Sequence, residues 1–166
     1  MNYIKITPYD IANGVGVRVV LWLAGCEHHC FKCHNHETWD PSVGKPFTDE
    51  VLEDLIKKVN SPHVQGITLS GGDPLATYNR ADVAKVVKAI RERCPGKDIW
   101  IYSGYTYEQL QTDPVAVDVL DHCDIFVDGR FQIENYAIDL HWKGSSNQRV
   151  IDLNATRLKG VVTTYC

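Results

Sequence analysis

The sequence predicts an α/β fold built on a mostly parallel β-sheet, and two observations carry this prediction. Short apolar runs rich in β-branched residues alternate with longer amphipathic segments along the chain of 166 residues. The distance in sequence between successive runs is long enough for helical crossovers, which join parallel strands and pack on the sheet. A chain of this length is expected to form a single domain, residues 1–166, with its own core.

The expected elements follow one another in a regular order. Strands are expected at residues 18–23, 66–70, 98–102 and 124–128. Helices are expected at residues 48–60 and 79–93, with shorter helical segments at residues 108–111 and 115–120. Thr48 is the expected N-cap of the first helix, because a hydroxyl there can accept a bond from a free amide. In the second helix, the spacing i, i+3, i+4 and i+7 of a buried face is followed by Val83, Val86, Val87 and Ile90.

Composition and charge exclude some functions. A formal net charge of −4 argues against a general nucleic-acid surface, which needs a basic field. No apolar run is long enough to span a bilayer. The chain has no charged-then-apolar leader at its start, so we expect a cytoplasmic protein without nucleic-acid or membrane partners.

Each expected strand is followed by a polar or glycine-rich turn. The four turns are a cysteine-rich loop at residues 26–33, Ser-Gly-Gly-Asp-Pro at residues 70–74, Ser103-Gly104 and Asp128-Gly129. The carboxyl ends of parallel strands meet at one edge of a sheet, and ligands of such folds bind beyond that edge. We therefore expect the four turns to converge on one ligand site.

The cysteine-rich loop has the spacing Cys26-x3-Cys30-x2-Cys33. Three clustered thiolates can hold three irons of a [4Fe–4S] cluster, because soft sulfur ligands suit iron–sulfur clusters. No fourth cysteine is close in sequence, so the fourth iron would have an open coordination site, at which chemistry can occur. The remaining cysteines, of which the first two are expected to be small apolar residues near the core, are Cys94, Cys123 and Cys166.

Two other interpretations of this loop stay open. A structural zinc site would combine the three cysteines with one histidine out of His28, His29, His34 and His36. A disulfide framework is typical of secreted chains, and this chain is not expected to be secreted. A zinc site would not require four strand-end turns to converge, so the convergence favours catalysis.

The glycine-rich turn has a physical rationale of its own. Gly71 and Gly72 allow the backbone to approach a ligand closely and to adopt positive φ, and Pro74 stiffens the exit. Asp73 adds an acceptor for an ammonium or hydroxyl group. Because the turn follows a parallel strand beside a cysteine-rich loop, we interpret it as a ligand-binding turn.

These two motifs together resemble those of the radical S-adenosylmethionine (SAM) enzymes. The cysteine spacing matches their cluster loop, and Gly71-Gly72-Asp73 matches their motif for the SAM amino group. More narrowly, the chain resembles the activating proteins of anaerobic ribonucleoside-triphosphate reductases, a family of small glycyl-radical activases. This resemblance runs from Met1 to about Ile151 and is carried by the segments at residues 10–14, 35–39, 69–75, 94–100, 102–105, 127–129 and 142–148.

The resemblance implies a mechanism, its cofactors and its partners. One electron from a reducing partner such as a flavodoxin would reach a [4Fe–4S] cluster held by Cys26, Cys30 and Cys33. The cluster would cleave SAM to methionine and a 5′-deoxyadenosyl radical, which would abstract hydrogen from a glycine of the reductase large subunit. The residues that the resemblance places against SAM are Lys32, Cys33, His34, Gly71, Gly72 and Asp73. Ser103, at the end of a strand, is a further candidate for SAM binding, or it caps the strand.

The resemblance also implies a partial, open (β/α) barrel of the radical SAM type, because the chain is short for a complete barrel. The gap would admit the partner's glycine loop. Lys32 stands where many radical SAM enzymes have an aromatic residue, and Phe31 lies one position earlier. Two alternative functions stay open: a small radical SAM enzyme of the deazapurine type acting on a small molecule, and a zinc-stabilised binding module.

A few residues outside the motifs have expectations of their own. Arg18 is expected to be a charge at the rim of the sheet. Asp128 ends a strand, where it caps the strand or touches SAM. No role is assigned to Arg149. The segment at residues 144–147 is expected to be a plain loop or a contact with SAM or the partner.

Overall fold

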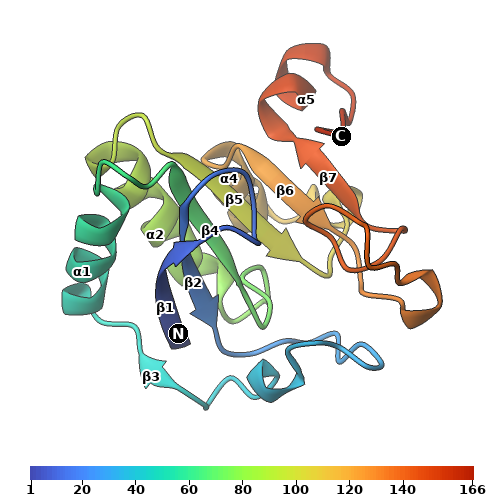
Figure 1. Ribbon diagram of the computed structural model, residues 1–166, viewed down its shortest axis with the longest axis horizontal. Helices are drawn as coiled ribbons and strands as arrows, with labels where there is room; N and C mark the ends of the chain where they lie inside the picture. Colours follow the sequence, from blue (N-terminus) through green and yellow to red (C-terminus); the bar gives the residue numbers. More distant parts are fainter.

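The computed structural model describes residues 1–166 and contains one sheet of seven strands, in the order β3-β1-β2-β4-β5-β6-β7 (Figure 1). The strands are β1 (Asn2–Asp10), β2 (Arg18–Leu23), β3 (Lys45–Pro46), β4 (Gly66–Gly71), β5 (Asp98–Ser103), β6 (Ile125–Asp128) and β7 (Arg149–Asp152). The helices are α1 (Asp49–Val59), α2 (Arg80–Arg93), α3 (Tyr107–Leu110), α4 (Pro114–Asp121) and α5 (Leu153–Lys159), with short 3₁₀ helices η1 (His36–Thr38) and η2 (Ile133–Asn135). None of the helices combines the length and apolar character that a bilayer crossing requires.

The four expected strands form the centre of the sheet, where β2, β4, β5 and β6 pair in parallel. Nearly every residue of β2, β4 and β6 is buried, as in parallel strands that are covered on both faces. This confirms the α/β class and the parallel arrangement of the central strands. The edges were not expected: β1 pairs antiparallel with β2 and β3, and β7 pairs antiparallel with β6.

The expected helices are all present, with ends that differ by one residue at most. The hydroxyl of Thr48 accepts a hydrogen bond from the amide of Val51 at 3.3 Å and so caps α1 as expected. Asp113 caps α4 in the same way, because its carboxylate accepts the amides of Val115 and Ala116. The apolar faces of α1, α2 and α4 pack into the main core.

The helices pack on only one face of the sheet. Successive side chains of a strand point to opposite faces, so Ile99 and Ile101 of β5 join the helices in the main core, whereas Trp100 points the other way. On this second face Trp100 forms a small apolar cluster, against which Val15 and Trp142 pack from loops. The candidate site lies on this side of the sheet, where loops rather than helices provide the cover.

Arg18 is fully buried, so its expected place at the rim of the sheet is wrong. Its guanidinium donates to Thr68 Oγ1 and to the carbonyl of Ile67, both at 2.8 Å. It also forms an ion pair with Asp98 at 2.6 Å and lies over the ring of Trp100. The charge is tolerated inside because the carboxylate and the hydrogen bonds compensate its desolvation.

Candidate functional site

The cysteine loop leaves the carboxyl end of β2 and has no regular secondary structure until η1. Its ends are fixed by backbone hydrogen bonds, from Gly25 N to the carbonyl of Thr38 and from Cys26 N to the carbonyl of Trp39. Within the loop, His29 and Lys32 have left-handed φ values of 49° and 54°. Residues with a β-carbon rarely adopt this conformation, so the backbone is strained at both positions.

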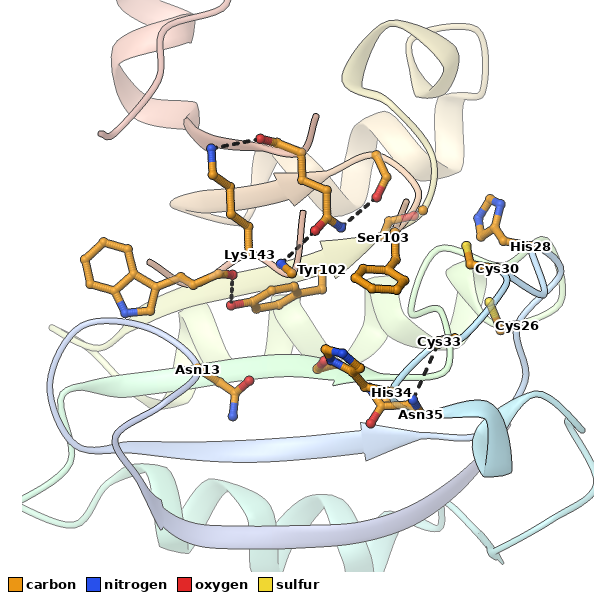
Figure 2. A pocket seen from close by; sticks show the side chains of 18 of the residues that line it. Asn13, Cys26, His28, Cys30, Cys33, His34, Asn35, Tyr102, Ser103 and Lys143 are labelled. Atoms are coloured by element: carbon orange, nitrogen blue, oxygen red, sulfur yellow. Dashed lines mark hydrogen bonds between the residues drawn. The ribbon is translucent and has the colours of Figure 1, made fainter. Parts of the chain in front are cut away.

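The three cysteines of the loop are free thiols, and each is half-buried. All three line one pocket, at one end of which Figure 2 shows them gathered. Burial raises the pKa of the Cys26 thiol to about 11 and also raises the pKa of Cys30. Burial thus opposes ionisation of the Cys26 and Cys30 thiols, and a bound metal would displace their protons. As the side chains stand, no three Cys, His, Asp or Glu residues are grouped to share a single metal ion.

The pocket has a volume of about 430 Å³, and its walls come from the four strand-end turns that the sequence places at one edge. The cysteine loop, the Gly71-Gly72 turn, Ser103-Gly104 and Gly129 all contribute, together with the connection between β6 and β7. The expected convergence is thus present. Aromatic side chains form much of the wall: Trp22, Tyr102, Phe131, Tyr136 and Trp142.

The lining of the pocket contains no carboxylate and a single lysine, Lys143. The Lys143 ammonium donates to the backbone carbonyl of Gln148 at 3.1 Å, at the end of the pocket opposite the cysteines (Figure 2). The two imidazoles of the lining belong to His28 and His34. The pocket therefore suits a guest that carries little charge beyond what the cysteine end binds.

The glycine-rich turn packs directly on the base of the cysteine loop. The amide of Asp73 donates to the carbonyl of Gly25 at 2.7 Å, and a β-carbon on Gly72 would lie 2.3 Å from that same carbonyl oxygen. Gly71 has a φ of 100°, which favours glycine. Both glycines are thus needed for the close approach of the two motifs.

The Asp73 carboxylate is 1% exposed, and donors from three parts of the chain occupy it. One oxygen accepts the amide of Leu75 at 2.8 Å. The other accepts Ser103 Oγ at 3.0 Å and the amide of Gly104 at 3.1 Å, and it lies 2.7 Å from Nε2 of His28. Asp73 therefore joins the glycine-rich turn, the end of β5 and the cysteine loop.

His28 is the residue through which the cysteine loop reaches this carboxylate. Its side chain is 3% exposed, packs edge-on against Tyr105 at 4.4 Å, and leaves Nδ1 buried without a partner. A β-carbon on Gly104 would lie 2.4 Å from the His28 ring, so the glycine makes room for the imidazole. From the sequence, His28 is predicted only as a possible zinc ligand. The burial of its side chain could not be predicted, because both of its neighbours, Glu27 and His29, are exposed.

Glu27 provides a second attachment for the cysteine loop. Its carboxylate accepts the amide of Thr77 at 2.7 Å, the hydroxyl of Thr77 at 2.8 Å and the hydroxyl of Tyr105 at 3.0 Å. Burial opposes ionisation, but these hydrogen bonds hold the pKa of Glu27 below its usual value. Two adjacent side chains, Glu27 and His28, thus fix the start of the loop directly after Cys26. Sequence reasoning missed both attachments.

The other expected cofactor residues differ in where they lie. His34 lines the pocket and packs against Phe131 at 5.0 Å, and Figure 2 shows its ring directed toward the pocket. Ser103 also lines the pocket, although its hydroxyl donates to Asp73. Lys32 is exposed, lies over the ring of Phe31 at 5.7 Å and is absent from the lining.

Asp128 and Arg149 form a network behind the pocket. The Asp128 carboxylate is buried, accepts the amide of Tyr107 at 2.8 Å and pairs with the Arg149 guanidinium at 2.5 Å. Arg149 also makes a two-pronged ion pair with Glu108. This network joins β6, β7 and α3, which gives Arg149 a structural role that the sequence did not assign.

Comparisons with known proteins agree with these features. Residues 12–151 match the family model described as a 4Fe-4S single cluster domain. The chain is 43% identical over 152 residues to the anaerobic ribonucleoside-triphosphate reductase-activating protein of Escherichia coli (strain K12), covering 90% of this chain and 97% of the relative. It is 38% identical over 150 residues to the protein of that name from Enterobacteria phage T4, covering 90% of this chain and 93% of the relative. The Pasteurella multocida (strain Pm70) protein of the same name is 37% identical over 150 residues, with 89% and 95% covered.

Proposed function

Because the chain belongs to the family of anaerobic ribonucleoside-triphosphate reductase-activating proteins, we propose that it activates the reductase large subunit as a radical SAM enzyme, acting as a single domain. The observation that carries the proposal is the meeting of three cysteines and a Gly-Gly turn in one pocket with no fourth cysteine beside them. When bound, the cluster and SAM supply a 5′-deoxyadenosyl radical able to take hydrogen from a glycine of the partner.

The donor set fits a [4Fe–4S] cluster with one open iron. Cys26, Cys30 and Cys33 line one end of the pocket, and the amide of Asn35 donates to Cys33 Sγ at 3.4 Å, a type of bond that tunes such clusters. A tetrahedral zinc ion would need its ligands around one point, whereas a cubane cluster takes each thiolate on a different iron. The match of residues 12–151 to the 4Fe-4S single cluster family model favours the cluster over the structural zinc site.

The remaining cysteines do not offer a fourth ligand. Cys94 and Cys123 are buried in the main core, as expected of small apolar residues, and Cys166 is exposed at the end of the chain. None of them lines the pocket. In the proposal, the three cysteines would hold the cluster and leave one iron free for SAM to bind.

The glycine-rich turn is proposed to hold the methionine part of SAM. Gly71 and Gly72 bring their backbone to the pocket wall next to the cysteine loop. Asp73 supports them from behind, since protein donors already occupy both of its oxygens. His34 and Ser103 line the same space and complete the proposed cofactor contacts, whereas a contact from Lys32 stays a prediction.

The rest of the lining is proposed to protect the radical and to admit the partner. Apolar and aromatic walls exclude water, which favours hydrogen transfer from the intended carbon over side reactions. In the proposal, the helix-free face of the sheet is the inner face of a partial (β/α) barrel, and the gap of this barrel would admit a glycine loop of the large subunit. Reduction by a flavodoxin also stays a prediction.

An anaerobic assay tests the proposal. The protein is reconstituted with iron and sulfide, reduced, and given SAM with or without the large subunit, and 5′-deoxyadenosine and the glycyl-radical EPR signal are measured. We expect both products from the wild type and from Cys166→Ala, and neither from Cys30→Ala. Nucleoside without a protein radical would point to a small-molecule substrate. A colourless protein with tightly bound zinc would overturn the radical SAM assignment.

A further inference from the structure

The connection between β6 and β7 carries a segment at residues 130–143, named here the rim arm, which forms one wall of the pocket. In Figure 1 this connection (orange) projects beyond the end of the sheet, on the same side as the cysteine loop. It contributes six apolar residues to the lining: Phe131, Tyr136, Ala137, Ile138, Leu140 and Trp142.

The base of the rim arm is held rigidly by residues 144–148. Ser145 is fully buried, and its hydroxyl accepts the amide of Gln132 at 3.1 Å. The amide of Ser146 donates to the carbonyl of Asn135 at 2.8 Å, and Asn147 donates to the carbonyl of Arg130 at 2.8 Å. The segment at residues 144–147 is therefore a buttress for the rim arm.

The tip of the rim arm presents apolar side chains to solvent. Ile138 is 91% exposed and Tyr136 is 48% exposed, although both also line the pocket. Ile133, on η2 nearer the base, is exposed as well. A rigid base with exposed apolar side chains at a pocket mouth is the arrangement of a preorganised binding surface, since little freedom is lost when a partner covers it.

The proposed function identifies what covers this surface. The reacting glycine belongs to another protein, so a segment of that protein must pass the pocket mouth, where Ile138 and Tyr136 lie. The lining there has no carboxylate, and its one ammonium already donates to a carbonyl, which suits an uncharged chain segment.

We propose that the tip of the rim arm, with Ile138 at its centre and Tyr136 and Ile133 beside it, is the docking surface for the glycine-bearing segment of the reductase large subunit. This inference rests on the proposed function, because it takes its partner from there. The contact is apolar and supplies affinity and partner choice, while the cysteine end of the pocket supplies the chemistry.

The chain offers a matched control for this surface. Leu158 on α5 is 88% exposed, nearly as exposed as Ile138, but it does not line the pocket. The rim arm precedes β7 and α5 follows it, so the two residues lie beyond opposite ends of that strand (Figure 1). An aspartate at either position adds the same charge to an equally exposed site.

The experiment measures the Kd between reconstituted protein and the purified reductase large subunit, anaerobically and with SAM present. Wild type is compared with Ile138→Asp, Ile138→Leu and Leu158→Asp, after iron content and the visible absorption band have confirmed that each variant is intact. We expect Ile138→Asp to weaken binding about ten-fold or more, as at an interface hot spot, and Ile138→Leu and Leu158→Asp to stay within about three-fold of wild type.

Two results would overturn the docking surface while leaving the proposed function in place. One is an Ile138→Asp protein that binds as tightly as wild type; the other is equal weakening by Ile138→Asp and Leu158→Asp, which would reflect added charge alone. If wild type itself does not bind the large subunit, the docking surface and the proposed partner both fail. Nucleoside formation by wild type, measured separately, tests the radical SAM chemistry independently of docking.

Discussion

His28 and Asp73 form a buried contact of 2.7 Å between Nε2 and Oδ2 that ties the cysteine loop to the glycine-rich turn. The two residues are 45 positions apart in sequence, and the same carboxylate oxygen also accepts donors from the end of β5. This contact thus helps to set where the proposed cluster ligands lie relative to the proposed SAM site.

We predict that this pair is energetically coupled. In a double-mutant cycle of His28→Ala and Asp73→Ala, the coupling free energy from urea unfolding should be about 1–3 kcal/mol, as for a buried hydrogen bond to a charged group. The neighbouring His29 stacks on Trp39 and does not contact Asp73, so a cycle with His29→Ala should be additive within about 0.5 kcal/mol. Equal coupling for both histidines would show that the contact has no special role.

Iron content should depend on three cysteines only. Cys26→Ala, Cys30→Ala and Cys33→Ala should each lose the visible absorption of the cluster after anaerobic reconstitution, because each removes the thiolate of one iron. Cys166→Ala should bind as much iron and sulfide as wild type, since Cys166 is exposed and outside the pocket. Iron and sulfide analysis measures this, and loss of iron in Cys166→Ala would contradict the proposed ligand set.

The Arg149 network should be far more important for stability than a similar ion pair on the surface. Arg149→Met leaves the buried Asp128 carboxylate without its countercharge and should lower the free energy of unfolding by about 3 kcal/mol. Arg93 makes an equally two-pronged pair with the exposed Glu53. Arg93→Met should change the unfolding midpoint far less than Arg149→Met in the same urea titration, because solvent screens an exposed ion pair. Losses of similar size would mean that Asp128 is not held as a buried charge.

The Asp113 cap should make α4 sensitive to acid. The amides of Ala116 and Val115 and the guanidinium of Arg80 hold the pKa of Asp113 below its usual 3.8. The folded pKa is the lower one, so the stabilisation is present above pH 3.8 and is lost as pH falls through the folded pKa. Asp113→Asn retains a capping group but cannot ionise. Its deficit in unfolding midpoint relative to wild type should be constant between pH 7 and 5 and shrink toward pH 3; a constant deficit at all three would contradict this.

The sequence predicted the centre of the fold because each central element carries its own local signal. β2 and β4 are continuous apolar runs, and Thr48 marks a helix start directly. β1 carries Pro8 and is mostly half-buried, so it lacks the alternation that marks a strand, and only its pairing with β2 defines it. β7 has four residues and depends on β6, which is distant in sequence.

The same distinction applies to the site. The cysteine spacing and the Gly-Gly turn are local patterns, so both were found, and the rule that parallel strands end at one edge was enough to bring them together. The burial of Arg18 depends on Thr68, which is 50 residues away, and the burial of His28 depends on Asp73, which is 45 residues away. The structure of the rim arm could not be predicted for the same reason. The hydrogen bonds from residues 145–147 that hold its base join residues that are not neighbours in sequence.

The attachments of Glu27 and His28 have a consequence for the life of the protein in air. The cysteine loop is anchored to Thr77, Tyr105 and Asp73 through oxygen and nitrogen atoms, none of which oxygen attack on iron and sulfide would remove. A chain that has lost its iron and sulfide therefore keeps the hydrogen bonds that position the cysteine loop. We therefore expect protein that has lost its iron and sulfide to bind them again on anaerobic reconstitution without first being unfolded.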